Sequence, residues 1–162
     1  MKLSEREIRE VAYHEAGHAV LAVLLNIPFI YVQVNKRLRL SVVRGQVGFQ
    51  TGGLLLRRSA RLSLRDIERL TLMMMAGPAV LKRLRRKSWD DVFETFRGGG
   101  WDDFDQSVHI LDLATGRFWA YEYLKRVRAR AVKAIGMHWD LITKIADALI
   151  ERGRLTRAEV PG

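Results

Sequence analysis

The chain contains the pentad His14-Glu15-Ala16-Gly17-His18, an HExxH motif within an otherwise apolar stretch. Residues four apart lie about one helical turn apart, so on a helix both imidazoles project from the same face and reach a single Zn²⁺ ion. A catalytic zinc site keeps one position open for water and lowers the pKa of that water to about 7. Glu15, beside the histidine pair, is therefore the candidate general base.

In an alternative interpretation, His14 and His18 have only a structural role. They are buried in the helix and their rings form hydrogen bonds with backbone carbonyls. This alternative explains either histidine alone, but it leaves Glu15 as a costly charge on a helix that faces the core. The sequence therefore favours the metal site.

Composition narrows the class of protein. With 162 residues and 48% hydrophobic content, the chain is expected to form a single domain over residues 1–162. It has no apolar run of the roughly 18 residues that a membrane helix needs, and the acidic Glu5 and Glu7 stand where a signal peptide is basic. We expect a soluble, cytoplasmic protein without membrane insertion.

The chain has no cysteine. Neither a disulfide framework nor a thiolate metal site is therefore available, and a metal must be held by histidine and carboxylate, the ligand set of catalytic zinc sites. His and carboxylate sites also bind other divalent ions, so the residue types alone do not fix the metal as zinc.

The formal net charge is +10, with basic clusters at Arg57-Arg58, Lys82 to Lys87 and Lys125 to Lys133. Such clusters suit nucleic acid, anionic lipid or an acidic partner, although a solvated surface is their commoner explanation. The chain has no RNA-recognition signature, no helix-turn-helix and no aromatic residues interleaved with the basic runs. Nucleic-acid binding is therefore disfavoured.

The first expected helix begins at Ser4, which forms a capping box with Glu7, and it runs to about Asn26 before Pro28 ends it. Alternating apolar residues then predict three short strands over 30–34, 38–42 and 47–49 in a small antiparallel sheet. An edge strand near the zinc could hold an extended peptide by backbone pairing.

A second helix is expected from Ser63, capped with Asp66, and the pair Gly77-Pro78 should kink or restart it. The methionines 73–75 are expected in the core. Residues 88–101 are expected to be a loop, leading to a helix that starts at Asp102-Asp103. Helices over about 117–135 and 138–152, with Gly153 as the stop, complete a mainly α fold with a small antiparallel β-sheet (α+β).

Two histidines do not complete a catalytic zinc site, which normally has three protein ligands. Spacing alone does not choose among the remaining candidates, which are several aspartates and His109, His138, Glu94 and Glu122.

The segment Val11 to Val20 resembles the zinc helix of the FtsH-type ATP-dependent metalloproteases, the M41 peptidase family, whose diagnostic string is HEAGHA. Three later segments agree in order. Met75 to Ala79 is similar to the family's LAGRAAE helix, Gly99 to Ser107 takes the place of its GASND segment, and Ile142 to Val160 resembles its closing apolar helix and basic turn.

The resemblance implies a zincin-type zinc metallopeptidase whose third ligand is the aspartate of the GASND-like segment. Asp103 matches that position better than Asp102, because a helix that starts there places apolar or small residues at the positions that face the core in the family. Those residues are Phe104, Ser107, Ile110 and Leu111. Asp102 is the second choice.

The chain departs from the family in lacking an AAA+ ATPase module and any GxxxxGK[ST] phosphate-binding loop. We therefore expect a stand-alone peptidase that cuts peptides, unfolded segments or a dedicated protein partner. Alternatively, a separate ATPase unfolds its substrates for it. A homo-oligomer is compatible with the resemblance, but Pro78 and Leu81 replace the family's arginine and glutamate, which puts its hexamer in question.

Two other interpretations remain open. The chain could be a metal-containing regulatory or interaction domain that acts through its basic surface without proteolysis. It could also be a zinc hydrolase of another lineage, with Glu94 or Glu122 as the third ligand.

Overall fold

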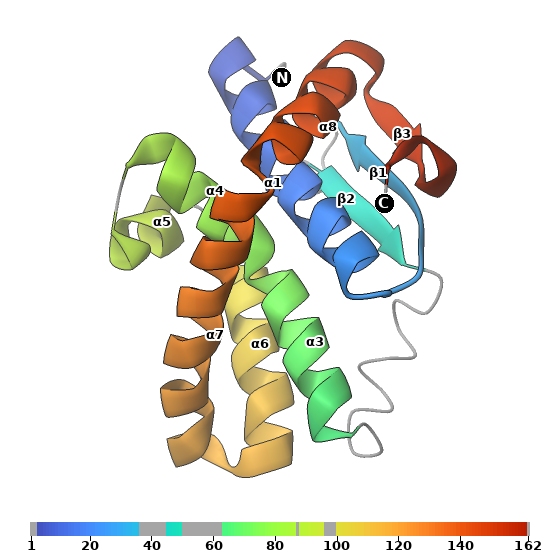
Figure 1. Cartoon of the computed structure of the whole chain (residues 1–162). Coiled ribbons are helices and arrows are strands. Elements are labelled where there is room, and N and C mark those ends of the chain that lie inside the picture. Colours follow the sequence, from blue (N-terminus) through green and yellow to red (C-terminus); the bar gives the residue numbers. More distant parts are fainter. Residues whose placement is uncertain (1–2, 36–44, 50–62, 87, 96–99, 162) are drawn as a thin grey trace.

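The computed structural model describes residues 3–35, 45–49, 63–86, 88–95 and 100–161, with the side chains of 45–49, 93–95, 100–102, 117 and 118 excluded. The elements are α1 (Glu5–Leu24), β1 (Phe29–Val34), β2 (Gly45–Phe49), α3 (Leu64–Met74), α4 (Ala76–Arg85), α5 (Trp89–Thr95), α6 (Gly100–Thr115), α7 (Arg117–Met137), α8 (Trp139–Arg152), β3 (Arg154–Thr156) and the 3-10 helix η2 (Arg157–Glu159). The fold is mainly helical with a small antiparallel sheet, as expected (Figure 1). Within these ranges no helix has an apolar stretch that would reach across a bilayer.

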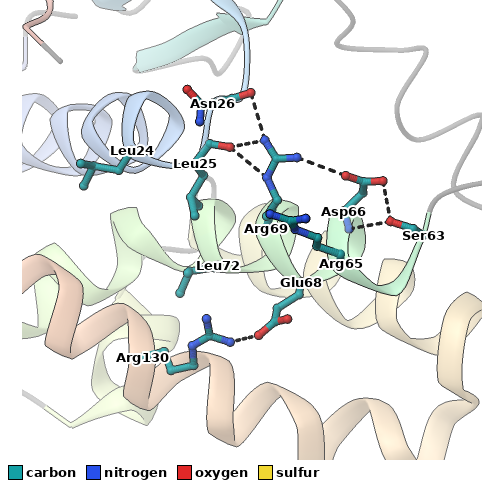
Figure 2. A pocket seen from close by; sticks show the side chains of 10 residues that line it. All are labelled: Leu24, Leu25, Asn26, Ser63, Arg65, Asp66, Glu68, Arg69, Leu72 and Arg130. Atoms are coloured by element: carbon teal, nitrogen blue, oxygen red, sulfur yellow. Dashed lines mark hydrogen bonds and ion pairs between the residues drawn. The ribbon is translucent and has the colours of Figure 1, made fainter.

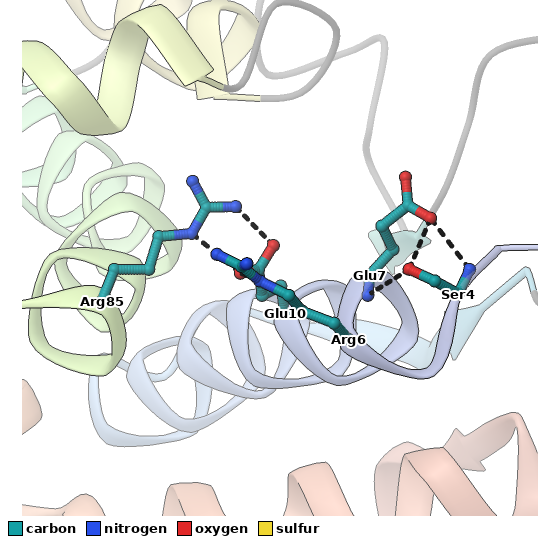
Figure 3. Close-up of polar contacts among 5 residues, drawn as sticks. All are labelled: Ser4, Arg6, Glu7, Glu10 and Arg85. Carbon is teal, nitrogen blue, oxygen red and sulfur yellow. Dashed lines mark hydrogen bonds and ion pairs between the residues drawn. The ribbon is translucent and has the colours of Figure 1, made fainter.

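Helix α1 is the central element of the fold (Figure 1). The predicted capping box is confirmed: the Ser4 hydroxyl accepts from the Glu7 backbone N–H, and the Glu7 carboxylate accepts from Ser4 (Figure 3). Every residue from 10 to 22 is buried, because α3, α4 and α8 and the sheet pack around this part of the helix. The HExxH motif therefore lies in the interior of the protein.

A buried ion pair ties α1 to α4. Arg85 donates through Nε to Glu10 Oε1 at 3.0 Å and through Nη2 to Glu10 Oε2, while Arg6 also donates to Glu10 at 3.2 Å (Figure 3). The Glu10 side chain is only 11% exposed. Two guanidinium groups thus neutralise a carboxylate that would otherwise be costly to bury.

Helix α1 ends at Leu24, two residues before the predicted end, and Asn26 adopts a left-handed conformation with φ of 52°. The carbonyls beyond its last turn are satisfied by Arg69 of α3. Its guanidinium donates to the carbonyl oxygens of Leu25 and Asn26, in the wall of a pocket between α1, α3 and α7 (Figure 2). Side-chain donors of this kind replace the missing helical hydrogen bonds.

The sheet has the strand order β2-β1-β3, with both pairs antiparallel. The predicted strands over 30–34 and 47–49 are confirmed as β1 and β2, and the one over 38–42 lies outside the described residues. A register shift between Phe29 and Tyr31 buries Phe29 and leaves Ile30 51% exposed. Strand β3 was not predicted, because its three residues give too short a pattern to recognise.

The predicted start of α3 is confirmed, since the Ser63 hydroxyl accepts from the Asp66 backbone N–H. The helix breaks at Met75, two residues before Gly77, and α4 begins at once. Pro78 has no N–H for the Met74 carbonyl, so an uninterrupted helix would lose a hydrogen bond there. The core assignment of methionines 73–75 is confirmed.

The loop predicted over 88–101 is wrong in part, because residues 89–95 form α5 and α6 begins at Gly100. Ser88 caps α5: its hydroxyl accepts from the Asp91 N–H and donates to the Asp91 carboxylate. That serine and aspartate spacing was the overlooked signal. The predicted helices α7 and α8 are confirmed, and Gly153 ends α8 with φ of 79°.

Gly17 allows α1 and α4 to approach each other closely. A Cβ atom at Gly17 would lie 2.7 Å from Val80 Cγ2 and 3.1 Å from the Ala76 carbonyl oxygen. Gly136, on the exposed side of α7, has only Arg83 Nη1 at 3.8 Å from such an atom. The two positions form a matched pair of helical glycines.

We expect Gly17→Ala to destabilise the protein by about 1 kcal/mol, because overpacking costs about 1–3 kcal/mol and exceeds the gain in helix propensity of about 1 kcal/mol. Gly136→Ala should instead stabilise it by up to about 1 kcal/mol. Thermal unfolding followed by circular dichroism measures both. An equal increase in Tm for the two variants would contradict the tight α1 and α4 contact.

Candidate metal centre

Helix α1 presents His14 and His18 one turn apart on the same face. Both side chains are buried, and their Nε2 atoms lie 3.0 Å from each other. The rings meet edge to face, with centroids 4.6 Å apart. This arrangement directs one nitrogen of each ring to a common point.

Helix α6 brings Asp103 to the same point. Asp103 Oδ2 lies 3.0 Å from His14 Nε2 and 3.2 Å from His18 Nε2. These spacings are close to the roughly 3.3 Å that separates ligand atoms bonded at about 2.0–2.1 Å to a tetrahedral zinc ion. Within the part of the chain that the structure describes, this is the one cluster of potential metal ligands found.

The break between α3 and α4 orients His18. The His18 Nδ1 atom lies 2.9 Å from the carbonyl oxygen of Met73. Because a carbonyl only accepts, Nδ1 carries the hydrogen, and in the neutral ring the lone pair is then on Nε2, the atom that faces Asp103. A carbonyl partner of this kind is common for metal-bound histidines. The alternative in which His18 is only structural expects such a carbonyl partner. The Met73 carbonyl, however, contacts only one of the two ring nitrogens of His18.

Gly77, near the start of α4, forms the wall of the cluster. A Cβ atom there would lie 2.5 Å from His14 Cε1 and 2.5 Å from His18 Nε2. Any side chain at this position would therefore displace the two rings. The missing Cβ leaves the space that a metal ion between the ligands needs.

Glu15 is buried directly beside the cluster, with an exposed fraction of 7%. Burial raises the pKa of the Glu15 carboxyl, the electrostatic interaction with His14 and His18 lowers it, and the nearby Asp103 raises it further. The Glu15 carboxylate, which follows His14 on α1, is therefore held where water has little access.

The ligand groups are coupled electrostatically. Burial by itself would lower the pKa of His18, but the Asp103 carboxylate outweighs it and raises this pKa to about 9. Burial likewise opposes the ionisation of Asp103, yet the two imidazoles hold its pKa well below the usual range. The carboxylate is thus charged and available as a ligand, and a bound cation would replace the histidine proton.

The structure places three of the other sequence candidates, His109, Glu122 and His138, away from this cluster. His109 is exposed on α6, and Glu122 is an exposed residue of α7 that pairs with Lys125 at 2.6 Å. His138 lies at the junction of α7 and α8 and does not join the cluster. Glu122 as a ligand is therefore contradicted. The side chains of Asp102 and Glu94 lie outside the described ones.

Sequence reasoning did not find the Met73 carbonyl or Gly77. Gly77-Pro78 was recognised as a helix break, but not as the wall of the site. The Gly77-Pro78 pair was the one sequence signal that could have indicated the wall of the site. Nothing in the sequence identified which backbone carbonyl would face His18.

No model of a known protein family matches the chain, and no curated protein is significantly similar to it. The resemblance to the M41 peptidases therefore remains a prediction.

Gly77→Ala tests the wall directly. The added methyl group should push the imidazoles apart and lower the affinity for zinc by at least about tenfold, in line with the loss on disturbing groups that support metal ligands. Zinc affinity measured by competition with a chelating dye, with Gly136→Ala as the control, gives the answer. Unchanged affinity in a folded Gly77→Ala variant would contradict the close approach.

Proposed function

We propose that this chain is a zinc metallopeptidase of the M41-like, zincin type, which hydrolyses peptide bonds with Glu15 as the general base. One observation carries the proposal: His14, His18 and Asp103 each offer a ligand atom, and these atoms lie within 4.8 Å of one another beside the buried Glu15. A histidine pair, a carboxylate and an adjacent glutamate are the parts that zinc-dependent hydrolysis requires.

The residues of the chain divide the chemistry among them. His14, His18 and Asp103 would hold the zinc, which when bound lowers the pKa of a water molecule and polarises the substrate carbonyl. Glu15, the carboxylate beside the ligands, would act as the general base toward water and would return the proton to the leaving amine. The Met73 carbonyl fixes the His18 ring, and burial keeps the Glu15 carboxylate away from competing solvent.

The proposed substrates are peptides, unstructured segments or a dedicated protein partner. These 162 residues include no GxxxxGK[ST] phosphate-binding loop. The unfolding of a stable substrate would therefore depend on an ATPase outside this peptidase domain. Strand β2 is at one edge of the described sheet, and β1 and β2 pack against α1. An extended peptide that added to this edge would run beside the helix that bears the motif.

The metal content of the purified protein tests the ligand set. Elemental analysis should find one zinc per chain in the wild type and far less in His14→Ala and Asp103→Asn, because the loss of one of three ligands weakens the site severely. His109→Ala, which removes an exposed histidine of α6, is the matched control and should keep its zinc. The ligand assignment is wrong if Asp103→Asn retains full zinc while circular dichroism shows a folded protein.

The role of Glu15 is tested by Glu15→Gln, which keeps the size of the side chain and removes the base. We expect this variant to bind zinc normally and to cut an unstructured protein such as casein about 10²–10⁴-fold more slowly. Glu122→Gln, on the exposed surface, should cut at the wild-type rate. If the zinc-loaded wild type leaves casein and peptide libraries intact, as Glu15→Gln does, the proposal of a peptidase is refuted.

A further inference from the structure

Helix α7 exposes cations and large apolar side chains together. Its 21 residues include six basic residues and one acidic residue. Among the side chains that the structure describes, eight large apolar ones are exposed, and four of them belong to α7: Trp119, Tyr121, Val132 and Met137. Apolar surface that is concentrated on one helix is more typical of an interaction site than single exposed apolar residues are.

The periodicity of the helix arranges these residues in two lines. Eighteen residues make about five turns, so Trp119 and Met137 lie at the same angle, with Arg126 and Lys133 close to the line that joins them. Trp119 is 63% exposed and Met137 is 65% exposed. Each end of this line is therefore apolar, and its middle is cationic. Tyr121, Lys125 and Val132 form a second line on another side of the helix, because a step of two residues, as from Trp119 to Tyr121, turns about 200° around the axis.

The positive charge of this face is only partly neutralised. Glu122 pairs with Lys125, and Arg130 pairs with Glu68 of α3. Arg126 and Lys133 are exposed and have no acidic partner among the described residues. Helix α4 extends the charge, because the Arg83 guanidinium lies beside Gly136 of α7 and over the Trp139 ring at 4.7 Å.

We propose that the outward face of α7, defined by Trp119, Arg126, Lys133 and Met137, docks the protein on a membrane surface that contains anionic lipids. The cations attract an anionic leaflet, and tryptophan and methionine side chains enter the region between head groups and acyl chains. The helix lies in the plane of the surface and does not cross it. This docking is independent of the metal centre, which is built on other elements, α1, α4 and α6.

Shape and composition favour lipid over nucleic acid. Proteins that bind single strands combine a basic groove with aromatic rings that stack on bases. Here the basic residues lie on the outward side of a helix, and Met137, one of the two exposed apolar side chains of the proposed face, is aliphatic. Such side chains gain free energy in a lipid interface but have no base-stacking role.

Sedimentation with vesicles tests the proposal. The protein should bind phosphatidylcholine vesicles that contain phosphatidylserine, bind pure phosphatidylcholine vesicles weakly, and dissociate as salt is raised. Arg126→Glu/Lys133→Glu should bind at least about 25-fold more weakly, since each cation near an anionic leaflet contributes about fivefold in affinity. Lys144→Glu/Arg154→Glu, with the same change in net charge on α8 and β3, is the control and should bind nearly as well as the wild type.

A second variant, Trp119→Ser/Met137→Ser, tests insertion. It should bind more weakly while keeping the salt dependence, and it should lose the blue shift of tryptophan fluorescence that binding produces in the wild type. Equal weakening by both charge-reversal pairs would overturn the proposal in favour of diffuse charge, and tight binding of single-stranded RNA without vesicle binding would overturn it in favour of nucleic acid. Asp103→Asn should bind vesicles like the wild type, which separates this result from any failure of the metal site.

Discussion

The close approach of α1 and α4 is the constraint on which the rest of the structure depends. Gly17 on α1 and Gly77 on α4 each occupy a point where a Cβ atom would collide with the opposite helix. Helices that meet at glycines can bring their backbones nearer than side chains normally allow. The approach is what encloses the two imidazoles, and the buried pair of Glu10 and Arg85 holds the same two helices together farther along. Because a buried ion pair is expensive to desolvate, we expect this pair to fix the alignment of α1 and α4 more than to add stability.

The interruption between α3 and α4 has two consequences in the same place. It ends α3 so that the Met73 carbonyl accepts from His18, and it starts α4 so that Gly77 faces the rings. A continuous helix would direct its carbonyls along its own axis to its own N–H groups. The cost of the break is small, because Pro78 already prevents one of the hydrogen bonds that a continuous helix would make. A weak point in secondary structure thus becomes a support of the candidate metal centre.

The proposed metal chemistry and the proposed membrane contact use opposite properties of the same helical scaffold. The histidines of the candidate ligand cluster are buried, and the Asp103 carboxylate lies within about 3 Å of both imidazoles. The outward face of α7 is exposed, and two of its cations, Arg126 and Lys133, have no acidic partner among the described residues. The inner side of α7 packs against α3, α4 and α6, so one helix supports the elements that carry the site and presents a separate surface outward. Substitutions on the outward face of α7 can therefore be made without directly changing the candidate metal ligands, and the reverse also holds.

The sequence by itself determined the local features whose causes lie within a few residues. The capping box at Ser4, the start of α3 at Ser63 and the spacing of His14 and His18 each follow from hydrogen bonds or periodicity within a single helix. Tertiary structure decided the rest. Asp103 is 85 residues from His18, and the Met73 carbonyl is 55 residues from it, so only packing could show that they meet. The three-residue strand β3 likewise exists because β1 offers a free edge, a contact between distant segments that no local pattern records.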